Sequence, residues 1–523
     1  MEPAAARTFE EPANDEVWDP AAGLPVEYAS SIDIFAGMWS LQPYVPSSST
    51  RGQQQQQLVE YNYYAAATQH DGPIVEQAAA QESLEVDLLH DMEMEIYNNN
   101  PILVFQEKAR KFKDDIGMMK MKIHRYPPSI QDLGDWYTVP RIVAIGPYHH
   151  RRQELRHTEN VKHVAAYHCI KTSGRSVQDM YYAVVSAVAE IDARRLYRED
   201  VMEGIVDADF LPMMFFDACF LVMYMIKMSG MDCNATLYDF FEFSANEIDH
   251  DIMLLENQIP WPVVDALLKY TSVPLAKFVA NWKDGRLQDW VDEVPSVVLD
   301  DSYEPPHLLG LLRFYIVGRT RSRTEVPGIG KMKSIQVSVS AMELAEMGIN
   351  IRAKKTTELA DMGLTKKRIL FAELSMAPLS LNDLNASLLV NMAALELCTT
   401  PNFFYDEAEF EDSAVCSYLL LLCMLVNRKE DVHHLRTKGI LQGGAGLTNT
   451  NALHFFTSLQ SLRLGRCCGN IMVQIESYRI KRPMRIKVYA FVYNNWKTIL
   501  KVLSVIGVFA SILSAIHSLK GAH

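Results

Sequence analysis

Apolar residues recur at helical spacing along most of the chain, which predicts a mainly α-helical protein. The clearest case is 209–230, a run rich in methionine and phenylalanine that is apolar on every side and must be deeply buried. Only 364–381 and 141–145 have the character of short strands. We therefore expect a multi-helix globular domain over 81–475 with minor strands. Its other helices are predicted at 78–97, 102–122, 177–198, 263–269, 287–294, 306–317, 340–348, 387–397 and 413–427.

Prolines interrupt the helical pattern between residues 123 and 150. Pro127, Pro128 and Pro140 precede the Gly146–Pro147 pair, and a residue before proline is pushed out of the helical region. This segment is predicted to be extended chain and turns, with its one strand at 141–145.

Three polar residues, Glu256, Asn257 and Gln258, interrupt an otherwise apolar stretch, DIMLLENQIPWP, at 251–262. A buried polar group without partners costs about 1–3 kcal/mol. Other parts of the chain are therefore predicted to close a hydrogen-bond network around the three side chains.

The ends of this stretch carry further signals. Pro260 and Pro262 exclude helix at its C-terminal side, because proline lacks an N–H and restricts the residue before it. Asp249 and Asp251 are predicted to precede a helix at 252–256. A structural polar cluster between two helices is the first interpretation, and a ligand site that includes Trp261 is the alternative.

The acidic net charge of −14 belongs to the N-terminus. Residues 1–95 contain 17 acidic residues and two arginines, so the remaining chain is nearly neutral. Residues 1–80, rich in Ala, Pro, Glu, Ser and Gln, are predicted to be a disordered tail. Its acidity argues against nucleic-acid binding.

The motifs of known catalytic and metal sites are missing from the sequence. The eight cysteines form no C-x-x-C pair, and neither G-x-S-x-G nor H-E-x-x-H occurs. Gly328–Lys331 resembles a phosphate loop only faintly, since Glu325 stands where its first glycine belongs. A histidine group is mixed with arginines whose charge would repel a cation: His149, His150, His157, His163 and His168. We expect no catalytic residue, metal or cofactor.

The C-terminal segment is predicted to cross a membrane once, as residues 499–519. Val502–Leu519 carries no charge except the titratable His517, and at 1.5 Å per residue it spans about 27 Å. The preceding segment, 476–498, is basic. Most cations of this region lie upstream of the span, so the positive-inside rule places the bulk of the chain in the cytosol. The result would be a single-pass, tail-anchored protein.

Small residues form one stripe along this predicted helix at spacings of three and four: Ser504, Gly507, Ser511, Ser514 and Ser518. Small residues let helices approach closely in lipid. The stripe therefore predicts self-association or a partner helix.

Several segments together resemble a plant family labelled domain of unknown function 247. The first block comprises Ile123–Pro127, Tyr137 and Pro140, Ile145–His150 (which includes Gly146, Pro147, Tyr148, His149 and His150), Leu155, Glu159 and Lys162. Asp217–Phe220 resembles the family's Asp-Gly-Cys-Phe, and Leu254–Pro260, LLENQIP, resembles its most recognisable motif. His307–Leu309, Ala341–Ile349, Asn391–Glu396 and Asp431–Ile440 follow in family order.

This resemblance implies an uncharacterised, membrane-anchored plant protein. It suggests recognition or signalling of the kind attributed to grass members in self-incompatibility. We therefore expect a non-enzymatic interaction protein with a protein partner or a second copy of itself. The alternative is a hydrolase or transferase with an unrecognised site near His149, His150, Glu256 and Asn257.

Overall fold

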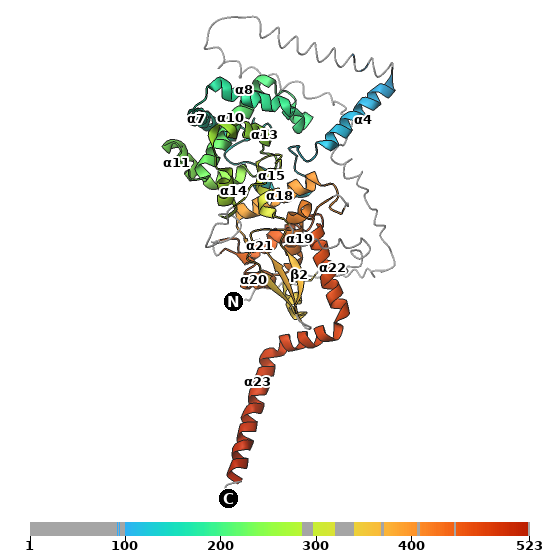
Figure 1. The fold of residues 1–523 in the computed structure, drawn as a ribbon. Coiled ribbons are helices and arrows are strands. Elements are labelled where there is room, and N and C mark those ends of the chain that lie inside the picture. Colours follow the sequence, from blue (N-terminus) through green and yellow to red (C-terminus); the bar gives the residue numbers. More distant parts are fainter. Residues whose placement is uncertain are drawn as a thin grey trace, which may run out of the picture. The chain divides into compact units, whose positions relative to one another are not determined.

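The computed structural model confirms a mainly helical fold with a few short strands (Figure 1). The structure describes residues 92, 94, 100–284, 297–319, 339–367, 371–404, 408–443 and 446–520. Apart from Met92, these belong to one unit, Met94–His523. The predicted disordered tail at 1–80, the helix at 287–294 and Gly328–Lys331 lie outside the described residues, as does most of the helix at 78–97.

The helices of the first half follow one another closely. They are α4 (Pro101–Gly117), α5 (Pro128–Gln131), α6 (Asp135–Thr138), η2 (Gln153–Leu155), α7 (Arg156–Ser173), α8 (Val177–Glu190), η3 (Ala193–Leu196), α9 (Glu199–Met202), α10 (Asp207–Met228), α11 (Ala235–Phe243), α12 (Ala245–Asp251), α13 (Trp261–Thr271), α14 (Leu275–Asp284) and α15 (Leu308–Val317).

The second half begins with a capping box at Ser340 and Glu343, which starts α17. Its helices are α17 (Ala341–Glu346), α18 (Asp383–Thr399), η4 (Glu411–Ser413), α19 (Ala414–Leu425), α20 (Lys429–Thr437), α21 (Asn449–Ser458), α22 (Arg466–Lys481) and α23 (Pro483–Lys520).

The predicted strands at 364–381 are confirmed and form two small sheets. One has the order β1-β3-β2, in which β3 (Phe371–Met376) pairs in parallel with β1 (Ile349–Ala353) and antiparallel with β2 (Gly363–Lys367). In the other, β4 (Leu379–Ser380) pairs in parallel with β5 (Leu441–Gln442).

Helix α10 is the centre of the first half, as its apolar sequence predicts. It packs against α7, α8, α13 and α14, and nearly all of its residues from Phe210 to Ile226 are buried. The helix is long and apolar enough to span a membrane, but its burial identifies it as a core helix.

Helix α23 is the other long apolar helix, and it differs from α10 in being exposed. Its window Ile486–Ser514 is long and apolar enough to cross a membrane, and none of that window is buried. At 1.5 Å per residue, 29 residues measure about 44 Å along the helix axis, so part of the window is enough for the roughly 30 Å of a hydrocarbon core. The same helix therefore includes both the predicted span at 499–519 and most of the basic segment at 476–498.

Four local predictions are wrong. Pro260 and Pro262 do not exclude helix, because Pro260 is the N-cap of α13 and Pro262 lies in its first turn, where no N–H is needed for a helical hydrogen bond. Residues 141–145 form no strand, because their N–H groups are bonded to side chains instead of a neighbouring strand. No helix forms at 252–256, since α12 ends at Asp251. The helix predicted at 177–198 ends at Glu190, two residues before Asp192 takes a left-handed conformation.

Candidate functional site

The motif segment runs from the end of α12 to the start of α13 as irregular, buried chain. Residues 252–260 are all buried, and Pro260 is the N-cap residue of α13. Irregular backbone leaves its N–H and C=O groups without helical partners, so side chains must supply many of the hydrogen bonds.

Residues 141–146 form a segment that we call the collar. Asp251 holds the backbone of its first three residues, 141–143. Its carboxylate accepts N–H groups from Arg141 (2.9 and 3.0 Å), Ile142 (2.7 Å) and Val143 (2.9 Å). Three consecutive N–H groups on one fully buried carboxylate form a charge-assisted anchor.

Asn257 continues this anchor along the collar. Its Oδ1 accepts the N–H of Ile145 at 2.7 Å, and its Nδ2 donates to the carbonyls of Val143 (3.0 Å) and Asp251 (2.9 Å). Both ends of the amide are thereby engaged by backbone, and Asn257 is completely buried.

Gln258 fixes the shape of the motif segment itself. Its Nε2 donates to the carbonyls of Ile252 (2.7 Å) and Leu254 (2.9 Å), and its Oε1 accepts the N–H of Leu309 at 3.1 Å. Since Leu309 lies in α15, this one side chain joins the motif to the first turn of another helix.

Glu256 lies closer to the surface than the two amides. Its Oε1 accepts the N–H of Tyr126 at 2.8 Å, and its Oε2 lies 3.7 Å from the Arg125 guanidinium. Burial raises the pKa of Glu256, while the Tyr126 N–H and the nearby Arg125 and Arg198 oppose that rise.

Tyr126 and Asn391 complete the network from outside the motif. The Tyr126 hydroxyl donates to Asn391 Oδ1 at 2.6 Å, and both oxygens lie within hydrogen-bond distance of the Leu255 N–H. Asn391 Nδ2 also donates to the carbonyl of Tyr137 at 3.1 Å. This ties α18 to the motif and to the chain before the collar.

Gly146 ends the collar beside a buried ion pair. Its N–H donates to Asp217 Oδ2 at 2.7 Å, and Asp217 Oδ1 lies 2.7 Å from Lys162 Nζ. Lys162 also donates to Glu159 at 2.7 Å. Burial opposes the charge on Lys162, but the two carboxylates hold its pKa above the ordinary value.

The residues after Gly146 are placed separately from the motif amides. Pro147 follows the turn, and the Tyr148 hydroxyl donates to the carbonyl of Ile123 at 2.8 Å. Burial, together with Arg152 and Arg125, lowers the pKa of His149 to about 3, so this imidazole is neutral. His149 is buried and His150 is half-buried, and neither hydrogen-bonds to Glu256 or Asn257 in the described structure.

The structure thus brings together Glu256, Asn257, Gln258, Gly146 and Asp217. Their polar atoms contact backbone groups, Arg125 and Lys162. A general base or nucleophile needs a free atom directed at a substrate. Among the described residues, no cluster of His, Cys, Asp and Glu has the arrangement of a metal site. The contacts of these side chains therefore support a structural polar network, while His149 Nε2 and His150 Nδ1 are buried without a hydrogen-bond partner in the described structure.

Sequence reasoning predicted the burial of the motif but missed the anchoring roles of Asp251, Tyr126, Lys162 and Asn391. Nothing in local spacing connects these residues with the collar. For Lys162 and Asn391, the signal in the sequence is their place in the segments that carry the family resemblance.

Comparisons with known proteins agree with that resemblance. The model of the DUF247 family, described as "Plant protein of unknown function", matches residues 123–510, which include the whole network and much of α23. The UPF0481 protein At3g47200 of Arabidopsis thaliana is 24% identical over 363 residues, covering 64% of this chain and 72% of that protein. No solved structure matches the chain.

Proposed function

Because this chain belongs to the DUF247 family of plant proteins of unknown function, we propose that it is a non-enzymatic interaction protein anchored in a membrane by α23. The observation that carries the proposal is the apolar window Ile486–Ser514, none of which is buried. Exposing so much apolar surface to water is unfavourable, whereas a bilayer accommodates it. Recognition of the self-incompatibility type, implied by the family resemblance, is the finer form of this proposal.

The charges around α23 favour a cytosolic domain. Seven cations stand between Glu476 and the end of the basic stretch, and no acidic residue follows Glu476: Arg479, Lys481, Arg482, Arg485, Lys487, Lys497 and Lys501. Such a bias holds its side of a membrane helix on the cytosolic face.

Topology can be tested with a glycosylation acceptor of the chain itself. Asn234, in Asn-Ala-Thr, is exposed at the N-cap of α11, whereas Asn385, in Asn-Ala-Ser, is buried in α18 and would report poorly on the folded domain. We expect the full chain, synthesised with microsomes, to resist carbonate extraction, to remain unglycosylated and to be digested by added protease. An endoglycosidase-sensitive mass shift with protease protection would reverse the orientation, and extraction by carbonate would refute the anchor.

Self-association through the small-residue stripe is the second expectation. Ser504, Gly507, Ser511 and Ser514 are all exposed, and the space beside Gly507 is open. The hydroxyls of Ser504 and Ser511 donate to the carbonyls of Lys501 and Gly507, both at 2.8 Å, so they are satisfied within the helix. Ser504 and Ser511 can therefore face another apolar helix without leaving their hydroxyls unbonded.

Replacing Gly507 and Ser511 together by leucine is expected to abolish association in a membrane two-hybrid assay, because the helices can no longer approach closely. The control replaces Val505 and Phe509, exposed residues away from the stripe, by leucine. Equal association of both variants with the unchanged chain would show that the stripe is not the contact.

A further inference from the structure

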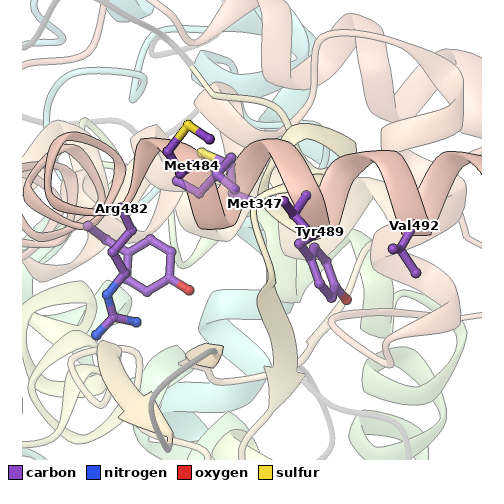
Figure 2. Close-up of a pocket in the computed structure, with 8 residues that line it drawn as sticks. Met347, Arg482, Met484, Tyr489 and Val492 are labelled. Atoms are coloured by element: carbon purple, nitrogen blue, oxygen red, sulfur yellow. The ribbon is translucent and has the colours of Figure 1, made fainter.

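A pocket of about 340 Å³ lies where α17, α22 and α23 meet (Figure 2). Its lining includes Met347 after α17, Tyr478 and Arg482 from the end of α22, and Met484, Tyr489 and Val492 from the start of α23. The volume is within the range of small-ligand sites, roughly 300–1,000 Å³.

The pocket is lined by apolar side chains along most of its length and by one charged side chain, Arg482, at one end. Figure 2 shows Arg482 at one end of the row of labelled side chains and Val492 at the other, with Met347 and Met484 between them. The Arg482 guanidinium lies over the Tyr478 ring, 4.8 Å from its centroid. An extended apolar group would therefore fit along the pocket, and an anionic group on it would be favoured near Arg482.

The surface around the pocket is both apolar and basic. Met484, Val488 and Phe491 are exposed by 70%, 61% and 64%, although soluble domains seldom leave large side chains so open. They stand among the seven cations from Arg479 to Lys501. Glu476 pairs with Arg479 at 2.8 Å, and with no other acidic residue in this stretch its net charge stays positive. Apolar residues interleaved with cations are the pattern of helices that lie on anionic membrane surfaces.

The pocket adjoins the membrane-spanning part of the same helix. Tyr489 and Val492 belong to the window Ile486–Ser514. Tyr493 and Trp496 follow, exposed by 38% and 55%, and such aromatic residues favour the headgroup level of a bilayer. In Figure 1, α23 bends within its first half, so the part that lines the pocket runs in a different direction from the rest of the helix.

We propose that this pocket binds one acyl chain of an anionic phospholipid from the membrane, with the lipid phosphate next to Arg482. The inference rests on the proposed membrane anchor and adds a specific lipid site to it. A second copy of this chain is disfavoured as the occupant, because it would bring the same net positive charge against this surface.

The test uses the full chain in proteoliposomes that contain phosphatidylserine with a photoreactive diazirine on one acyl chain. After illumination, mass spectrometry locates the lipid adducts. The decisive peptide contains Met347, because it lies far from α23 in the sequence and only the pocket brings it to an acyl chain. We expect lipid adducts on this peptide, and fewer with an equivalent phosphatidylcholine probe.

Two pairs of variants distinguish lipid binding in the pocket from insertion of α23 into the bilayer. Val492→Trp fills the pocket and should reduce labelling of the Met347 peptide about tenfold, the effect expected when one or two buried methylene groups are displaced. Its control, Val508→Trp, alters an exposed position of α23 outside the pocket. Arg482→Gln should remove the preference for phosphatidylserine, whereas Lys497→Gln should retain it.

The outcomes distinguish this inference from the anchor proposal. Carbonate-resistant chain with adducts only on the spanning part of α23, or Met347 labelling unchanged by Val492→Trp, would overturn the lipid site alone. Cross-links between two copies at the pocket residues would also overturn it, in favour of self-association. A chain that carbonate extracts would overturn both.

Discussion

Asp251→Asn is expected to lower the free energy of unfolding by about 3–5 kcal/mol. The carboxylate accepts the N–H groups of Arg141, Ile142 and Val143, and it is completely buried. Asparagine has nearly the same shape, but it replaces one acceptor oxygen by an NH₂ donor that would face backbone N–H groups, and it removes the charge beside His250 Nδ1, which lies 2.8 Å from Asp251 Oδ1. Denaturant unfolding of the full chain in detergent, followed by circular dichroism, measures the loss.

Asp265→Asn provides the matched control for this prediction. Asp265 pairs with Lys269 at 3.1 Å on the exposed side of α13, and surface pairs of this kind contribute about 0–1 kcal/mol. If Asp251→Asn destabilised the chain no more than Asp265→Asn, the collar would not depend on the buried carboxylate.

Gly146→Ala is expected to cost about 3 kcal/mol or more, since it combines backbone strain with a steric clash. Gly146 has φ +75°, and a Cβ there would lie 2.5 Å from the backbone oxygen of Gln258. Neither backbone can easily retreat, because the Gly146 N–H is bonded to Asp217 and the Gln258 carbonyl accepts the Tyr197 hydroxyl. Thermal and denaturant unfolding report the change.

Gly174→Ala separates the two causes. Gly174 also has a positive φ, +65°, at the C-terminus of α7, but a Cβ added there would meet no atom within 4 Å. Left-handed alanine alone costs about 1–2 kcal/mol. A Gly146→Ala loss no larger than that of Gly174→Ala would mean that the close approach to Gln258 is relieved without cost.

Much of the fold follows from periodicity, because helices bury a face that repeats along the sequence. The apolar run at 209–230 predicts α10 to within two residues at each end, and its unbroken apolar character predicts its burial. The prediction of a strand at 141–145 was wrong because a strand depends on distant hydrogen-bond partners as well as on its own residue types. Its residue types suit a strand, but the partners of its N–H groups are the Asp251 and Asn257 side chains, which no local pattern specifies.

The sequence predicts that the polar residues of the candidate site need hydrogen-bond partners, but it does not predict which residues supply them. Polar residues inside an apolar segment require partners, and this correctly places Glu256, Asn257 and Gln258 inside a network. The identity of those partners depends on how distant helices pack. The meeting of Tyr126 with Asn391, across 265 residues, therefore appears only in the folded structure.

The collar also constrains the order in which the chain acquires its structure. Its N–H groups are bonded to acceptors that follow them by 71 to 112 residues. Closing such long loops costs conformational entropy before any contact compensates for it, so domains with many distant contacts fold slowly. During synthesis, the collar and helices α7 and α8 leave the ribosome before the motif segment does. The collar N–H groups and the apolar faces of these helices therefore lack their partners until the motif segment has emerged. In that interval the nascent chain exposes surface that chaperones recognise and that favours aggregation.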